Sequence, residues 1–248
     1  MAVLPRVLCI GGSDPGMGAG LQMDERVVRA LGCEFVGVTT LETVQDKEGL
    51  RSVTPRDPEQ ILSEVNEALQ NVAAVKTGAL GTEAIVRSLY RPFRDRPELP
   101  LVVDPVAAAS RVAESGFVSD AGGGTSPGPQ LLTSKGEAAL FQGLAGIATV
   151  VTPNQLEYEA SKYSECRTVL LKGGHAEGDE VCDELLIPGE QPKKFCSPRI
   201  SGVENAHGTG CAFASAVAVF LASGLALEHA CAGAHAAMQQ WLSDGFFS

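Results

Sequence analysis

The chain lacks the features that mark membrane, secreted and nucleic-acid-binding proteins. No apolar stretch reaches the length that a membrane span needs, and residues 1–6 lack the charged-then-apolar layout of a signal peptide. There is no run of Lys or Arg, and the net charge of −11 disfavours binding to nucleic acid or to an anionic membrane surface. We therefore expect a cytoplasmic protein with no nucleic-acid or membrane partner.

The cysteines also lack a recognisable pattern. None of the seven forms a C-x-x-C pair, and their spacing matches neither a disulfide framework nor a zinc site. The sequence therefore predicts reduced thiols. The cysteines are Cys9, Cys33, Cys166, Cys182, Cys196, Cys211 and Cys231.

What is present is an alternation of short apolar runs with longer helical patterns. The 248 residues, 44% of them hydrophobic, are sufficient for one domain over residues 1–248. Strands are predicted at 7–10, 35–40, 74–77, 101–104, 148–151 and 168–171, helices at 21–31, 58–69, 83–90 and 212–221, and a polar loop at 41–57. This pattern predicts an α/β fold with a doubly wound, mainly parallel sheet and helices on both faces.

A glycine-rich stretch interrupts this alternation. Residues Glu114 to Ser134 contain Gly122-Gly123-Gly124 and Pro127-Gly128-Pro129, a composition that cannot build a core. We expect a mobile loop, with a lid over bound substrate as the alternative.

The most informative motif is His207-Gly208-Thr209-Gly210-Cys211, which precedes a long apolar helical run. Glycines at a helix start leave the first backbone N–H groups unobstructed, so this turn predicts an anion site, most plausibly for phosphate. A helix N-terminus also favours a thiolate, and Cys211 is therefore predicted to have a lowered pKa. The alternative is a small-residue turn with a buried structural thiol.

Polar residues and glycines follow each predicted strand. In an open parallel sheet, ligands bind at the carboxyl ends of the strands, so together these residues predict a site at that edge, although any one could be a helix cap or turn former. The first loop matches neither the dinucleotide-binding motif nor a P-loop. The residues are Gly12, Asp14, Gly18, Ala19 and Gly20; Gln45; Gly78; Asp104; Thr152, Asn154 and Glu157; Lys172, Gly173, Gly174 and His175.

The motifs in this order resemble one enzyme family, from about Val7 to Leu242. The chain resembles the hydroxymethylpyrimidine and hydroxymethylpyrimidine phosphate kinases of thiamine biosynthesis, members of the ribokinase-like superfamily, whose fold is a doubly wound α/β sandwich. The superfamily usually places Asp as general base where Cys211 stands. The motifs that carry the resemblance are Gly12-Ser13-Asp14-Pro15, Gly18-Ala19-Gly20-Leu21-Gln22-Met23-Asp24, Val44-Gln45, Lys76-Thr77-Gly78, Val103-Asp104-Pro105-Val106, Thr152-Pro153-Asn154 with Glu157, Lys172-Gly173-Gly174-His175, and His207 to Cys211.

The residues supply what phosphoryl transfer to a primary alcohol requires, namely positioning, charge neutralisation and a base. The amides of Gly208, Thr209, Gly210 and Cys211 are predicted to hold the transferring group. Cys211 is the expected proton acceptor, and Lys172 is expected to offset phosphate charge unless it is an ordinary surface lysine.

Oxygen ligands for a metal ion and amide groups for ligand recognition are also present. Asp104 and Glu157, with Asn154, are hard ligands suited to Mg²⁺ held largely through water, as the resemblance also implies. Asn154, Thr209 and Lys172 are expected on the nucleotide side. The Gln45 amide can match the ring nitrogen and amino edge of an aminopyrimidine, or it can be a solvated loop side chain.

The resemblance implies an acceptor pocket, and the chain departs from the family near it. The segment between Glu157 and Lys172 is shorter than the family usually has, and residues 107–111 lack its usual methionine and lysine. A small residue at position 79, where the family often has methionine, admits a larger or differently placed substrate. The implied substrate residues are Gly12, Ala19, Asp24, Gln45, Ala79 and Val106.

We therefore expect an ATP- and Mg²⁺-dependent kinase that phosphorylates the hydroxymethyl group of 4-amino-5-hydroxymethyl-2-methylpyrimidine, its monophosphate, or both, and acts as a homodimer. A pyridoxine or pyridoxal kinase of the same fold is one alternative. A degenerate member that binds a pyrimidine or nucleotide without turnover is the other. The presence of Lys172, Glu157 and Cys211 argues against the binder, which needs no base beside the phosphate.

Overall fold

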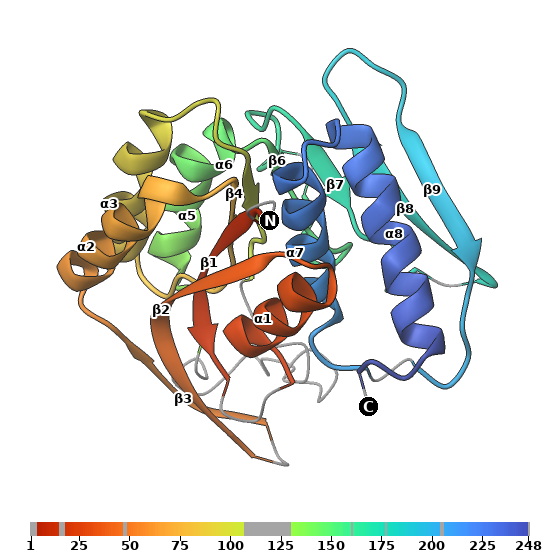
Figure 1. Cartoon of the computed structure of the whole chain (residues 1–248), viewed down its shortest axis with the longest axis horizontal. Helices are drawn as coiled ribbons and strands as arrows, with labels where there is room; N and C mark the ends of the chain where they lie inside the picture. The colour runs from red at the N-terminus through yellow and green to blue at the C-terminus, as the bar shows by residue number, and fades with distance from the viewer. Residues whose placement is uncertain are drawn as a thin grey trace, which may run out of the picture.

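The computed structural model describes residues 4–14, 18–46, 49–106, 130–159, 161–176, 178–203 and 206–247. A twisted sheet runs through its centre, with strands in the order β3-β2-β1-β4-β5-β6-β7-β8-β9 and helices on both sides (Figure 1). The strands are β1 (Arg6–Ser13), β2 (Glu34–Asp46), β3 (Gly49–Pro55), β4 (Ala74–Thr77), β5 (Leu101–Val103), β6 (Val150–Val151), β7 (Val169–Leu171), β8 (Glu180–Leu186) and β9 (Lys193–Pro198).

Two helical layers cover the sheet, each over its own hydrophobic cluster. On one face lie α1 (Gly20–Ala30), α7 (Thr209–Ala222) and α8 (Leu227–Ser243). On the other lie α2 (Pro58–Ala68), α3 (Glu83–Arg94), α5 (Ser134–Gln142) and α6 (Leu144–Ile147), with the short 3-10 helix η1 (Leu69–Asn71) after α2. Successive β1 side chains alternate between the clusters, since Val7 and Cys9 pack under α7 whereas Leu8 and Ile10 face the second layer.

The central strands β2, β1, β4, β5, β6 and β7 are parallel, as predicted from their continuous apolar runs. Local signals also set helix ends where the sequence places them. Asp57 caps α2 by accepting hydrogen bonds from the Glu59 and Gln60 N–H groups, and Gly32, with a φ of 77°, follows the end of α1. The predicted doubly wound, mainly parallel fold is confirmed.

The predicted polar loop at 41–57 is wrong. Strand β2 continues to Asp46 and pairs antiparallel with β3, with Thr43 opposite Val53. The polar side chains in this region favour a loop, but an edge hairpin with solvent on one side also needs few apolar residues. Leu41 and Leu50 supply the buried side of this hairpin.

The prediction of reduced thiols is also wrong at one pair. Cys182 on β8 and Cys196 on β9 stand directly opposite each other in an antiparallel hairpin and form a disulfide. Their separation of 14 residues matches no sequence motif, because it is set by the hairpin register. The other five cysteines are free thiols.

Most of the glycine-rich stretch, residues 114–129, lies outside the described residues. Its end is not loop: Leu131 and Leu132 are buried, Thr133 caps the N-terminus of α5 and Ser134 begins that helix. In the described part of the 157–172 segment the chain forms turns and no helix, which agrees with its short length. Among the described residues, none of the helices combines the length and apolar character of a membrane span.

Candidate active site

A cavity of about 400 Å³ opens at the carboxyl ends of β1, β4 and β5. Strand β1 lies between β2 and β4, so the strands that follow it in sequence are added first on one side of β1 and then on the other. Open α/β sheets bind ligands at such a switch point in strand order. The cavity collects most of the predicted residues. It is lined by Gly12, Asp14, Ala19, Gly20, Asp24, Gly78, Ala79, Asp104, Val106, Asn154, Glu157, Lys172, His175, Gly208, Gly210 and Cys211.

A second cavity of about 210 Å³ adjoins the first, between α7, α8 and β8. Thr209 lines this cavity rather than the larger one, and five residues line both: Asn154, Lys172, His175, His207 and Gly210. Gln45 ends up near the far end of β2, opposite Leu50, and its side chain lies outside what the structure describes. Two adjoining compartments therefore meet at the start of α7.

The start of α7 requires glycine. Gly208 is the N-cap with a φ of 80°, and a Cβ atom there would lie 2.0 Å from the Gly18 carbonyl oxygen. A Cβ at Gly210 would lie 3.4 Å from Lys172 Nζ. The glycines thus let the first loop, the helix N-terminus and a lysine ammonium approach one another closely, as an anion site needs.

Cys211 lies beside this helix start, but its pKa is not lowered. Burial, together with the nearby Asp24 and Asp104 carboxylates, raises the pKa of the thiol to about 11. Lys76 and a hydrogen bond from the Gly20 backbone N–H lower the pKa of the thiol, but by less than the other groups raise it. The predicted lowered pKa is therefore wrong, because desolvation outweighs the effect of the helix N-terminus on the thiol.

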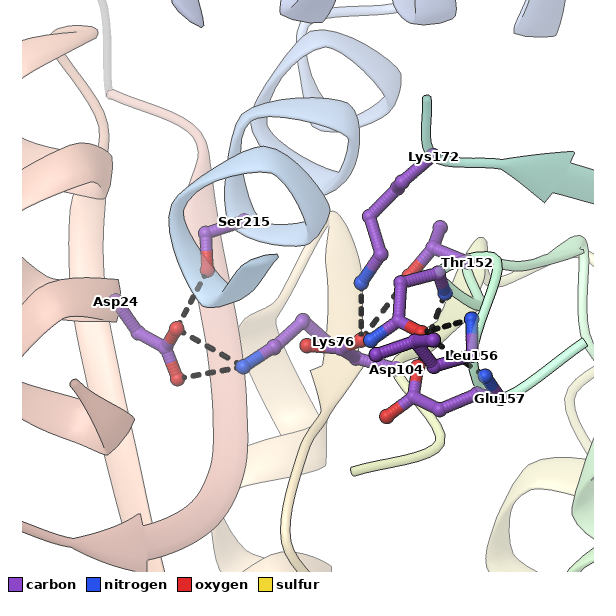
Figure 2. Close-up of polar contacts among 9 residues, drawn as sticks. Asp24, Lys76, Asp104, Thr152, Leu156, Glu157, Lys172 and Ser215 are labelled. Atoms are coloured by element: carbon purple, nitrogen blue, oxygen red, sulfur yellow. Dashed lines mark hydrogen bonds and ion pairs between the residues drawn. The ribbon is translucent and has the colours of Figure 1, made fainter. Parts of the chain in front are cut away.

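Lys172 forms a buried ion pair, which excludes the surface-lysine alternative. Its Nζ lies 2.8 Å from Asp104 Oδ1, and the residue is 9% exposed. Figure 2 shows Lys172 reaching Asp104 from β7 while Thr152 approaches from the neighbouring strand end. Burial alone would lower the pKa of Lys172, but Asp104 and Glu157 together raise it, so the ammonium stays charged.

The second oxygen of Asp104 is the best candidate for a metal ligand. Asp104 is 2% exposed, and no described residue donates a hydrogen bond to its Oδ2. A buried carboxylate oxygen without a protein partner fits a hard cation such as Mg²⁺. The described residues contain no group of three or more His, Cys, Asp and Glu side chains arranged for a metal, so most ligands would come from water or substrate oxygens.

Asn154 and Glu157 close a tight turn after β6. Asn154 Oδ1 accepts hydrogen bonds from the Leu156 and Glu157 N–H groups at 2.8 and 2.9 Å, and Glu157 Oε2 accepts one from Asn154 N at 3.0 Å. Asn154 is thus a turn former, one of the two readings left open by the sequence. The reciprocal bonds fix the Glu157 carboxylate in the cavity near Lys172 (Figure 2).

Asp24, which the resemblance implies as a substrate residue, lies in the second turn of α1 and is fully buried. Both its oxygens lie 2.9 Å from Lys76 Nζ, and Ser215 Oγ donates to Oδ1 at 2.8 Å (Figure 2). Because these partners occupy the carboxylate, a direct hydrogen bond from a substrate to Asp24 is disfavoured.

Sequence reasoning missed Lys76 and Ser215. A lysine within the buried strand β4 signals a buried counterion, because an unpaired charge would be too costly there. Ser215 carries no comparable signal, since a serine in an apolar helix is common. The cavity walls also include Phe141 and Tyr163, which lie far from the motifs in sequence.

A loop contact closes the remaining side of the larger cavity. Asp14 Oδ2 accepts a hydrogen bond from Ala19 N at 3.1 Å and lies 3.7 Å from His207 Nε2. His207 thereby joins the first loop to the start of α7, between the two compartments. The arrangement places a glycine turn suited to an anion, a buried lysine and a carboxylate at the junction of two cavities, which is a layout suited to phosphoryl transfer.

Comparison with known proteins agrees with this geometry. A model of the phosphomethylpyrimidine kinase family matches residues 14–247. The chain belongs to the phosphomethylpyrimidine kinase family. A hydroxymethylpyrimidine/phosphomethylpyrimidine kinase of Streptomyces coelicolor is 30% identical over 262 residues, covering 98% of this chain and 90% of that protein.

The chain is also similar to a longer plant protein and to a solved pyridoxal kinase. A chloroplastic thiamine biosynthetic bifunctional enzyme of Arabidopsis thaliana is 33% identical over 243 residues, 89% of this chain, and the chain spans only 43% of that longer protein. The structure of a pyridoxal kinase from Staphylococcus aureus in complex with pyridoxal superposes with a TM-score of 0.78 at 25% identity, covering 98% of this chain and 89% of that one.

Proposed function

We propose that this chain transfers the γ-phosphoryl group of ATP to the hydroxymethyl group of 4-amino-5-hydroxymethyl-2-methylpyrimidine, to its monophosphate, or to both, as a step of thiamine biosynthesis. The observation that carries the proposal is the glycine turn at the start of α7, where Gly208 and Gly210 bring an anion-binding helix N-terminus against the buried Lys172. Family membership supports the substrate class.

The two cavities suggest which substrate binds where. The larger one, bounded by Gly12, Ala79 and Val106, takes the pyrimidine, and the smaller one takes the nucleotide. The phosphate chain then crosses the shared wall at Gly210 and Lys172. Thr209, which lines the smaller cavity, faces the nucleotide in this arrangement.

Lys172 and the α7 amides stabilise the negative charge of the transferring group. Its transition state is loose, with charge spread over the equatorial oxygens, so fixed positive groups contribute more than an early proton transfer. Cys211 is mainly a thiol at neutral pH, because its pKa is raised to about 11. It therefore accepts the hydroxyl proton in its minor thiolate form and late in the transfer.

Mg²⁺ fits the carboxylates on the phosphate side. Asp104, through its unpartnered Oδ2, and Glu157 would hold the ion mainly through water, and the ion would neutralise phosphate charge there. Asp104 Oδ1 would remain available to Lys172 while Oδ2 faces the ion, so the lysine would keep its orientation toward Gly210.

A panel of acceptors tests the substrate class. ADP release is measured with hydroxymethylpyrimidine, its monophosphate, pyridoxal and ribose as separate acceptors, with a Lys172→Met variant as the control for contaminating kinases. We expect turnover on one or both pyrimidines and little on ribose. Turnover confined to pyridoxal would reassign the acceptor, and ATP binding without turnover on any acceptor would indicate the non-catalytic binder.

We also propose a homodimer that works in the cytoplasm. The β2–β3 hairpin at one sheet edge exposes Val44 by 58%, a surface that a second copy can cover. Five free thiols suit a reducing compartment, whereas the Cys182–Cys196 disulfide does not. Light scattering at micromolar concentration is expected to give twice the chain mass. A monomer at that concentration would contradict the assembly.

A further inference from the structure

Lys76 is a fully buried ammonium at the floor of the larger cavity. A Cβ atom at Gly78 would lie 3.0 Å from Lys76 Nζ, so the ammonium lies against the Gly78 backbone, which lines the cavity. Burial alone would lower the pKa of Lys76, but the Asp24, Cys211 and Asp104 charges together raise it well above its ordinary value. The lysine is therefore a permanent positive charge that the phosphoryl-transfer scheme above does not use.

Its counterion connects it to the helix that carries Cys211. Asp24 binds Lys76 with both oxygens at 2.9 Å and accepts a hydrogen bond from Ser215 at 2.8 Å. Ser215 follows Cys211 by four residues on α7, so the two side chains share one face of the helix. Figure 2 shows the Asp24 carboxylate of α1 between Ser215 of α7 and Lys76 of β4.

We propose that Lys76 is a positioning residue that makes the Cys211 thiol lose its proton more readily. Its counterion Asp24 opposes this effect of Lys76 on the thiol. Lys76, Asp24 and Cys211 all line the larger cavity, so both charges of the ion pair lie in the same cavity wall as the thiol. Lys76 favours the thiolate and Asp24 disfavours it. The inference rests on the proposed role of Cys211, but it concerns the thiol itself and is tested without turnover.

Few other ionisable groups among the described residues act on the Cys211 thiol. The other ionisable groups that act on this region are Asp104, which also raises the pKa of Cys211, its partner Lys172 at 2.8 Å, and the fully buried Cys9 thiol of β1. Ser215 donates its hydroxyl hydrogen to Asp24 and is also a hydrogen-bond partner of the Cys9 thiol. Lys76 and Asp24 are thus the charge pair that Ser215 connects to the helix of Cys211.

The test is the rate of alkylation by iodoacetamide as a function of pH. Cys211 suits it because the other free thiols, Cys9, Cys33, Cys166 and Cys231, are all buried. We expect Asp24→Asn to raise the rate at pH 8 about tenfold, since it removes a repelling charge and leaves Lys76 facing the thiol. Lys76→Met should lower the rate about tenfold.

Three control variants separate the effect on Cys211 from other causes of a changed alkylation rate. Cys211→Ser identifies the Cys211 signal, and Arg56→Met removes the remote ion pair with Glu64 and should leave the rate unchanged. If Lys76→Met fails to fold because Asp24 is left unpaired, the neutral double variant Asp24→Asn/Lys76→Met replaces it, and its rate should fall below that of Asp24→Asn. Equal rates for Asp24→Asn and wild type, or a decrease, would overturn the proposal.

Discussion

At the scale of single residues, the site depends on how charged side chains pair in the wall of the larger cavity. Lys172 with Asp104 and Lys76 with Asp24 form two buried ion pairs that arrive from opposite sides of the sheet centre (Figure 2). Buried pairs of this kind contribute little net stability compared with apolar residues of similar size. Their value lies in fixing charge where the phosphate and the thiol need it.

Replacing Cys211 by serine tests the proton acceptor. Serine keeps the size and the helix amides but does not ionise near neutral pH, so kcat should fall about 100-fold with KM little changed. Below its pKa of about 11, the wild-type thiolate grows about tenfold per pH unit, and kcat should rise toward alkaline pH. The serine variant should lose that rise, and a wild-type kcat in the variant would remove Cys211 from the chemistry.

At the scale of elements, the sequence predicted the central strands and the helices α1, α2, α3 and α7, but not α5, α6 or α8. Strand β4 and the boundaries of α1 and α2 follow from apolar runs, a glycine stop and the Asp57 cap. The edge hairpins were missed because their side chains are half exposed and their pairing is set by register, which no local pattern reveals. The Cys182–Cys196 disulfide was missed for the same reason.

The site follows the same division between local and distant information. Most of the strand-end motifs come together in one cavity, because parallel strands place their carboxyl ends at one edge. The pKa of Cys211 could not be predicted from its motif, because it depends on burial and on Lys76 and Asp24 from other elements. Helix α7, buried over most of its length, is what brings these distant residues against one thiol.

At the scale of the whole molecule, the buried thiols make stability depend on pH. Burial raises the pKa of Cys231, on α8, from 9.0 to about 12. The folded protein therefore holds this proton more tightly than the unfolded chain, so the stabilisation is complete below pH 9 and is lost as pH rises toward 12. This one thiol should remove up to about 1.4 kcal/mol of the free energy of unfolding per pH unit in that range.

Urea unfolding at pH 8, 9 and 10 measures this dependence. We expect Cys231→Ala to be less stable than wild type at pH 8 and to lose less free energy of unfolding between pH 9 and pH 10. The difference between the two proteins isolates Cys231 from the other groups that titrate there. Parallel curves for the two proteins would show that Cys231 does not carry the effect.

The central claim is that the junction of the two cavities passes a phosphoryl group from ATP to a pyrimidine alcohol. Phosphorus NMR of a reaction of the wild-type protein with ATP, Mg²⁺ and 4-amino-5-hydroxymethyl-2-methylpyrimidine tests it most directly. The account predicts a new phosphomonoester resonance coupled to the methylene protons of the pyrimidine, or a diphosphate when the monophosphate is supplied, with ADP formed in equal amount. ADP accompanied only by inorganic phosphate, with both pyrimidines unchanged, would contradict it.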